Sequence, residues 1–233
     1  MEEQDAKRIA GYAAVDEFVK NNQVVGIGAG STVPFCVERI KQRVDEEGLS
    51  LVCIPSGYQA KQLILDHGLI LSDLSQHPDI DVAIDGADEI DKDLNLIKGG
   101  GGCQLQEKIL ASCAKLLIIV ADFHKESQNL GEYWKRGVPV EVIPMAVVPV
   151  MNKVKKLGGN PVIRFGVMKA GPVVTDNGNL VVDVDFGIIQ NPNELNEQLT
   201  RIPGVVETGL FIGMADKVFI GQADGGLHTI VRK

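Results

Sequence analysis

Short apolar runs alternate with amphipathic segments over the first half of the chain. The runs with the length of buried strands are VVGIG at 24–28, LVCI at 51–54, DVAI at 81–84 and KLLIIVAD at 115–122. Apolar side chains recur at helical spacing in the segments 5–20, 31–44, 59–66 and 104–114. Apolar strands that alternate with helices are typical of a parallel sheet covered on both faces. We therefore predict an α/β fold, with a Rossmann-like parallel sheet and helices on both of its faces.

The pattern changes near residue 131. The following segments predict a strand at 138–143, a helix at 146–158, a hairpin at 172–184 with Asn177-Gly178 at its turn, and a short helix before Pro203. The last apolar segments, VVETGLF, DKVFIGQ and HTIVRK, are strand-like and are expected to rejoin the first domain. We predict a Rossmann-like catalytic domain of residues 1–130 and 207–233, and a smaller α+β domain of residues 131–206.

Composition and charge exclude several classes of partner. The chain of 233 residues has a net charge of -8, so no global field attracts nucleic acid or an anionic membrane. The apolar run LLIIVA is far too short for a membrane helix, and the acidic N-terminus lacks the apolar core of a secretion signal. The 4 cysteines and 4 histidines have no zinc-like spacing. We expect a cytoplasmic protein that binds neither nucleic acid nor membrane.

Unusual loops follow the predicted strands, where ligands bind in parallel α/β sheets. GAGST at 28–32 places small residues and two hydroxyls before a helix, an arrangement that suits a phosphate. The alternative is a tight turn with an ordinary helix cap. A dinucleotide site is disfavoured because Ser31 stands where the third glycine of that motif belongs, and no lysine precedes Ser31 as a P-loop requires.

The second loop, DGADEID at 85–91, is strongly acidic. Asp85 and Asp88 directly follow a predicted strand, where carboxylates can accept hydrogen bonds from sugar hydroxyls. The residues from Asp91 onward match only half of a calcium loop, because Leu96 replaces its glycine and Gly102 its last carboxylate. We therefore expect no metal site.

The third loop, KGGGG at 98–102, offers a cation and a row of backbone N–H groups to a phosphate or a developing oxyanion. A linker is the alternative, although this run lies well inside the first domain. Glu107 follows in the first turn of the next helix. Taken alone, it is an ordinary favourable charge near a helix N-terminus.

Several motifs in this order resemble the ribose-5-phosphate isomerase type A family, and CIPSGYQAKQLI and LGEYWKRG resemble its eukaryotic branch. The motifs are GIGAGST, IDGADEID, LIKGGGG with the following EK, IVAD, VEVIPMA, VVTDNGN and IPGVVETGLF. The resemblance implies interconversion of ribose 5-phosphate and ribulose 5-phosphate through an enediolate, in the non-oxidative pentose phosphate pathway. It also implies no metal, no organic cofactor and a homo-oligomer, either a dimer or a tetramer.

The resemblance assigns the general base to Glu107. It assigns substrate binding to Ala29, Gly30, Ser31, Thr32, Asp85, Gly86, Ala87, Asp88, Lys98, Gly99, Gly100, Gly101 and Lys125. In the mechanism that follows, Lys98 stabilises the negative oxygen, while Asp85 or Asp88 moves hydroxyl protons. The segment PSGYQA at 55–60 departs from the family pattern, and Gly57 is expected to loosen that loop. A coenzyme A transferase and a non-catalytic sugar-phosphate sensor are the alternatives on the same fold.

Overall fold

The structure, a computed structural model, describes residues 3–232 and divides into two compact units. The first unit comprises the chain up to Ala87, residues Gln106–His124 and the chain from Met214 onward. The second unit comprises Asp88–Leu105 and Lys125–Gly213. Each unit has its own sheet and its own apolar core, so each is described by itself.

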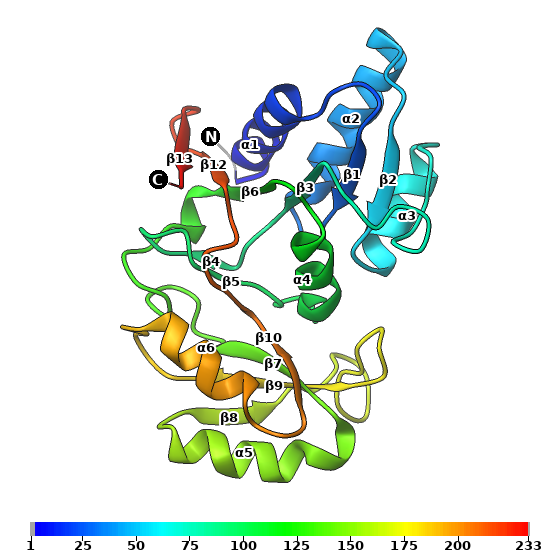
Figure 1. The fold of residues 1–233 in the computed structure, drawn as a ribbon. Coiled ribbons are helices and arrows are strands. Elements are labelled where there is room, and N and C mark those ends of the chain that lie inside the picture. Colours follow the sequence, from blue (N-terminus) through cyan, green and yellow to red (C-terminus); the bar gives the residue numbers. More distant parts are fainter. Residues whose placement is uncertain (1–2, 233) are drawn as a thin grey trace. The chain divides into compact units, whose positions relative to one another are not determined.

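The first unit is built on a six-stranded sheet (Figure 1). Its strands, in spatial order, are β13 (Leu227–Val231), β12 (Lys217–Gly221), β6 (Leu117–Asp122), β3 (Val82–Asp85), β1 (Val24–Ile27) and β2 (Val52–Pro55). Every neighbouring pair is parallel except β12 and β13 at one edge. This arrangement confirms the predicted α/β class.

Helices pack on both faces of this sheet. The helices are α1 (Glu3–Phe18), α2 (Val33–Glu47), α3 (Tyr58–Asp66) and α4 (Gln104–Ser112). Cys53 of β2 belongs to the apolar cluster that α1 and α2 cover, whereas the next residue, Ile54, packs against Leu110 of α4. Successive strand residues point to opposite faces, so both faces of the sheet are buried. This explains why its strands are continuous apolar runs.

The second unit contains two antiparallel sheets. The larger has the order β10 (Val205–Thr208), β7 (Val138–Val142), β9 (Leu180–Asp185) and β8 (Asn160–Ile163). The smaller consists of β11 (Leu210–Phe211), β5 (Leu96–Ile97) and β4 (Glu89–Ile90). Helices α5 (Val147–Lys156) and α6 (Pro192–Thr200) contribute Val150 and Leu199 to the apolar core of this unit. The remaining elements are two short 3-10 helices, η1 (Phe123–Lys125) and η2 (Pro144–Ala146).

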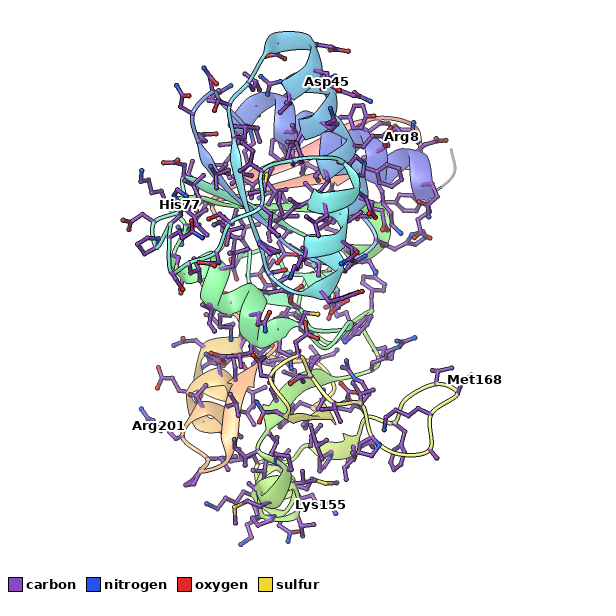
Figure 2. The ribbon with its side chains drawn as sticks, turned by 90° about the vertical axis from the view of Figure 1, so that its right-hand side faces the viewer. Arg8, Asp45, His77, Lys155, Met168 and Arg201 are labelled. Carbon is purple, nitrogen blue, oxygen red and sulfur yellow. The ribbon has the colours of Figure 1, made fainter. Side chains whose placement is uncertain are left out.

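Charged side chains such as Lys155 of α5 and Arg201, which directly follows α6, are exposed to solvent (Figure 2). Met168 lies at the tip of an exposed loop after β8 (Figure 2). The expected turn at Asn177-Gly178 is present, because Gly178 has a φ of +80° and the Thr175 N–H donates to the Asn179 carbonyl at 2.8 Å. The regular strand β9 begins only after this turn.

The compact units do not follow the expected domain boundaries residue by residue. Residues 88–105 lie in the second unit because β4 and β5 pair with β11 rather than with the parallel sheet. A compact unit is not by itself an independently folding domain, so the division at 131–206 stays a prediction. Within residues 3–232, none of the helices is long and apolar enough to cross a membrane.

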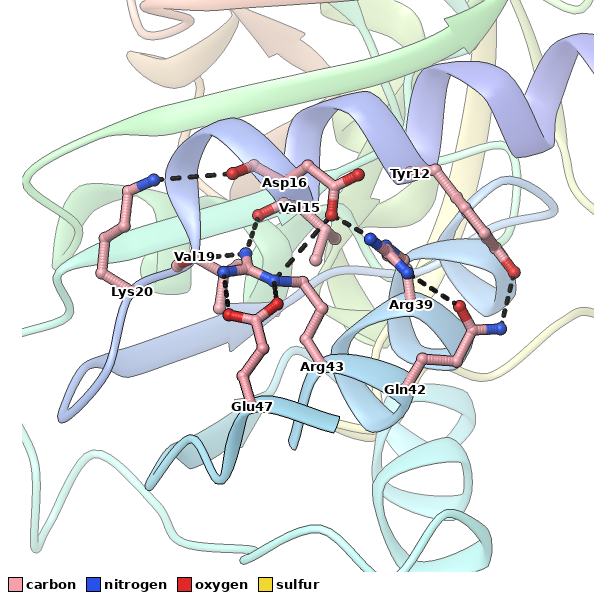
Figure 3. A network of polar contacts seen from close by, with 9 residues as sticks. All are labelled: Tyr12, Val15, Asp16, Val19, Lys20, Arg39, Gln42, Arg43 and Glu47. Atoms are coloured by element: carbon pink, nitrogen blue, oxygen red, sulfur yellow. Dashed lines mark hydrogen bonds and ion pairs between the residues drawn. The ribbon is translucent and has the colours of Figure 1, made fainter. Parts of the chain in front are cut away.

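A polar network joins α1 to α2 within the first unit (Figure 3). The Arg43 guanidinium of α2 donates from Nη1 to the carbonyls of Val15 and Val19, both at 2.9 Å. These carbonyls lie at the C-terminal end of α1, where a helix leaves some backbone acceptors without a helical partner, and that of Val15 also accepts from the Val19 N–H at 3.0 Å. Nε and Nη2 of Arg43 donate to the Glu47 carboxylate one turn along α2. Arg43 therefore acts as a C-terminal cap supplied by a neighbouring helix.

We predict that Arg43→Met lowers the free energy of unfolding by about 2–3 kcal/mol, because hydrogen bonds from a charged group to two carbonyls are lost. Arg39→Met is the matched control on the same helix face. Arg39 pairs with the half-exposed Asp16, so its loss should lower that free energy by less than about 1 kcal/mol. Urea unfolding followed by circular dichroism measures both, and equal losses would contradict the capping role.

Candidate functional site

Asp85 fixes two loops of the first unit at the end of β3. Its side chain is buried, with the residue only 3% exposed, and Oδ1 accepts hydrogen bonds from the N–H groups of Ala29 at 3.0 Å and Gly86 at 2.7 Å. A Cβ on Gly28 would lie 2.0 Å from this same oxygen. Residue 28 must therefore be glycine for the carboxylate to reach the β1 loop.

The β1 loop continues through Gly30 to the N-terminus of α2. Gly30 has a φ of +109°, which disfavours a side chain, and it exchanges two hydrogen bonds with the side-chain amide of Gln59. Thr32 is the N-cap residue of α2, although its side chain makes no capping hydrogen bond. Ser31 is exposed and Thr32 is buried. The helix N-terminus behind these hydroxyls favours an anion.

Asp88 and the glycine loop form a second group, within the second unit. The Asp88 N–H donates to the Ile97 carbonyl at 2.8 Å, and Oδ2 of Asp88 accepts from the Gly100 N–H at 2.6 Å. A Cβ on Gly100 would lie 2.6 Å from the Asp88 carboxylate and 2.9 Å from the Trp134 ring. Only glycine therefore allows this contact between carboxylate and backbone.

Burial raises the pKa of the Asp88 carboxyl. The Gly100 hydrogen bond and the charges of Lys98, Lys125 and Arg164 act in the opposite direction, in that order, but do not cancel the desolvation. A carboxyl with a raised pKa gives up its proton at a higher pH than an exposed aspartate does. Asp88 is therefore better suited than a solvated carboxylate to donate a proton to a sugar oxygen.

Two lysines of the expected site lie near aromatic rings of the second unit. Lys98 is only 2% exposed, and its backbone N–H donates to the Gly209 carbonyl at 2.8 Å. The Nζ atom of its side chain lies 5.4 Å from the centroid of the Phe211 ring. The Nζ of Lys125 lies 5.9 Å from the centroid of the Trp134 ring. Rings at this distance stabilise a cation that has lost part of its hydration.

Glu107 lies in the first turn of α4 and belongs to the first unit. The residue is 5% exposed, so its carboxylate is not the solvated surface charge that a helix N-terminus often carries. A buried acid is expected to have a specific task, and this burial strengthens the sequence-based choice of Glu107.

In the acidic loop after β4, the Asp91 carboxylate accepts hydrogen bonds from the backbone of the same loop. Oδ1 of Asp91 accepts from the N–H groups of Asp93 and Asn95, and Oδ2 accepts from the Asn95 side chain at 2.9 Å. Leu94 takes a positive φ of 62° within this turn. No group of three or more metal-ligating side chains occurs among the described residues. The part of the acidic run from Asp91 onward is thus a local turn.

Three side chains that we did not single out also contact these loops or lie beside them. Gln59 holds Gly30, as described above. Arg164, just after β8, donates to the carbonyls of Gly99 and Gly100. Lys7 of α1 is buried, with Nζ 3.9 Å from Oδ2 of Asp122 at the end of β6. Gln59 lies in the segment CIPSGYQAKQLI, although nothing there marks its side chain, and Arg164 is more than 60 residues from Gly99 and Gly100.

The chain is similar to known proteins over nearly its whole length. Residues 52–225 match the family described as ribose 5-phosphate isomerase A (phosphoriboisomerase A). The chain is 58% identical over 226 residues to the ribose-5-phosphate isomerase of Sus scrofa, which covers 97% of this chain and 74% of that protein.

The chain is also similar to solved structures of ribose 5-phosphate isomerases. Ribose 5-phosphate isomerase A from Methanocaldococcus jannaschii is 41% identical, with a TM-score of 0.92 over 99% of this chain and 100% of that one. A D-ribose-5-phosphate isomerase in complex with phospho-erythronic acid is 37% identical, with a TM-score of 0.94 over 100% of both chains. The similarity therefore covers the fold and all the loops described above.

We predict that Gly100→Ala lowers the free energy of unfolding by about 1–3 kcal/mol, because the new methyl group would overlap the Asp88 carboxylate and Trp134. Gly101→Ala is the control, since a Cβ there meets no atom within 4 Å. Urea unfolding of the two variants provides the comparison. If Gly101→Ala proved as destabilising as Gly100→Ala, the steric argument would be wrong.

Proposed function

The chain belongs to the ribose 5-phosphate isomerase A family and is an aldose–ketose isomerase, and we propose that Glu107 is its general base. The reaction interconverts D-ribose 5-phosphate and D-ribulose 5-phosphate. The observation that carries the assignment of the base is the buried Glu107 carboxylate, placed one turn into the helix that follows the glycine loop. The resemblance found in the sequence motifs is confirmed, including that to eukaryotic members. Nothing in the structure favours the transferase or the sensor.

The phosphate is assigned to the loop from Ala29 to Thr32. A helix N-terminus and two hydroxyl groups favour a dianion, and Asp85 and Gln59 hold the backbone of this loop in place. The fixed loop loses little conformational freedom when the ligand binds, which improves affinity.

The hydroxyl groups of the sugar are assigned to Asp85, Asp88 and the backbone of Gly86 and Ala87. Both carboxylates are oriented by backbone N–H groups, so their positions are set before the substrate arrives. The raised pKa of Asp88 makes it the better donor of a proton to the ring oxygen when the furanose opens. Lys125 contributes positive charge to the same group.

The chemical step moves one proton between adjacent carbons. In the open-chain aldose, Glu107 removes the proton from C2, the electrons form the enediolate double bond, and the former carbonyl oxygen at C1 becomes negative. The C2 hydroxyl then gives its proton, through Asp85 or Asp88, to the negative oxygen on C1, so that the C2 oxygen becomes the negative one. The protonated Glu107 delivers its proton to C1 as the C2 carbonyl forms. Lys98 and the N–H groups of Gly99 and Gly101 stabilise the negative oxygen, while the Gly100 N–H holds Asp88.

A phosphorylated sugar acid supports this assignment. The relative of known structure binds phospho-erythronic acid, whose carboxylate places negative oxygens at one end of a phosphorylated four-carbon chain. That charge distribution is similar to the one that the enediolate develops. A site suited to such an acid needs backbone and side-chain donors for an anion, as each of the two glycine-containing loops provides.

The setting of the reaction is proposed from the sequence. We place the enzyme in the cytoplasm, in the non-oxidative pentose phosphate pathway, as a homodimer or tetramer that needs neither metal ion nor organic cofactor. The net charge of -8 supports a small-molecule substrate rather than nucleic acid as its partner.

Glu107→Gln should lower kcat by at least about 10²-fold with little change in KM, since the variant keeps the shape of the side chain and loses the base. Glu107→Asp keeps the charge one methylene farther back and should retain more activity than the Gln variant. The control is Glu46→Gln, the same substitution on the exposed end of α2, which should leave kcat unchanged. Steady-state assays measure all three. A Glu107→Gln variant within tenfold of wild type would transfer the role of base to another group.

A further inference from the structure

The glycine loop of residues 99–101 is held from one side by a single arginine. Nη1 of Arg164 donates to the carbonyl of Gly99 at 2.9 Å and to the carbonyl of Gly100 at 3.0 Å. Gly99 has a φ of +97°. Consecutive glycines have more accessible backbone states than any other sequence, so without such an anchor this loop would lose much entropy on binding a ligand.

The contact with the carbonyls also sets the direction of the N–H groups. Among the described residues no peptide bond is cis, and in a trans peptide the C=O and N–H point in opposite directions. With the carbonyls of Gly99 and Gly100 turned to Arg164, the N–H groups of Gly100 and Gly101 are turned away from it. The N–H of Gly100 donates a hydrogen bond to Oδ2 of Asp88 at 2.6 Å.

Arg164 is itself fixed to the larger sheet of the second unit. Its Nε donates to Oδ2 of Asp183 on β9 at 2.8 Å, and its Nη2 donates to Oδ1 of the same carboxylate. Its backbone N–H donates to the Val181 carbonyl at 2.9 Å. A forked ion pair of this kind leaves the guanidinium little freedom, and a lysine could not reproduce it.

The guanidinium charge has a second effect. A cation on a carbonyl oxygen polarises the peptide group and strengthens its N–H as a donor, most of all where water is partly excluded. Arg164 and Asp183 are both largely buried, with side chains 15% and 17% exposed. The polarised donors are the N–H of Gly100, which holds Asp88, and the N–H of Gly101, which is assigned to the substrate.

We propose that Arg164, held by Asp183, is a positioning residue that aims the Gly101 amide at the substrate oxyanion and the Gly100 amide at Asp88, which it keeps in place. The inference rests on the proposed function, because it assigns Arg164 a part in the same reaction without contact to the substrate. It predicts that the loss of Arg164 affects the transition state, where the oxyanion is formed, more than it affects substrate binding.

The closing experiment compares four variants by steady-state kinetics and thermal unfolding. Arg164→Met should lower kcat by roughly 10–10²-fold with a smaller change in KM, somewhat less than the loss of an oxyanion donor itself. Arg164→Lys should recover only part of kcat. Asp183→Asn should act in the same direction, and the double variant Arg164→Met, Asp183→Asn should be no worse than Arg164→Met, because both changes disturb one unit.

Arg136→Met is the matched control. Arg136 lines the same groove of about 600 Å³ as Arg164, Asp183 and Gly100, and its guanidinium lies 5.5 Å from the Trp134 ring centroid. This variant should keep kcat within twofold. Millimolar methylguanidinium, which fits the space left by the shortened side chain, should restore activity to Arg164→Ala and should leave the activity of Arg136→Ala unchanged.

The outcomes separate this inference from the proposed function. If the wild-type protein had no isomerase activity, the proposed function would fail. If it were active and a folded Arg164→Met variant kept kcat within twofold, the positioning role would fail. A loss of kcat that merely followed thermal stability, with no recovery by methylguanidinium, would also overturn it by reducing Arg164 to a structural residue.

Discussion

The close approach of two carboxylates to glycine backbone is the constraint on which the loops of this protein depend. The Asp85 carboxylate accepts hydrogen bonds from the N–H groups of Ala29 and Gly86, and the Asp88 carboxylate accepts one from the N–H of Gly100. Neither position tolerates a neighbouring side chain, because a Cβ on Gly28 or Gly100 would lie 2.0 Å or 2.6 Å from a carboxylate oxygen. The glycines thus let the carboxylates come close to the backbone. The hydrogen bonds to the aspartates in turn restrict the flexible backbone of these loops.

Several charged side chains of these loops and of the following helix are buried. Asp88, Lys98 and Glu107 lie in surroundings that shield them partly or fully from water, where each interaction is stronger than at the surface. Asp88 responds with a raised pKa, and Lys98 lies against the Phe211 ring. An isomerase that moves a proton needs groups whose protonation states differ from those of exposed side chains. In the proposed mechanism these buried charges take part in the chemistry as well as in the fold.

Much of this could be predicted from local sequence. The alternation of apolar runs and helical segments predicts the parallel sheet, because a strand buried on both faces must be continuously apolar, and the small-residue loops after β1 and β3 mark the strand ends. The pairing of β4 and β5 with β11 could not be predicted, since two-residue strands have no periodicity. Arg164 could not be predicted either, because it contacts its loop from a distant segment and occurs in no motif. Gln59 does lie in the segment CIPSGYQAKQLI, but nothing in the sequence shows that its side chain holds Gly30.

Crystallography of the protein with a phosphorylated four-carbon sugar acid would test the central claim most directly. The account predicts that the phosphate lies on the loop of Ser31 and Thr32. It also predicts that the acid's carboxylate is bound by Lys98 and the Gly101 amide, with the Glu107 carboxylate beside the carbon next to it. A ligand bound by other loops, or a Glu107 carboxylate out of reach of that carbon, would contradict the account.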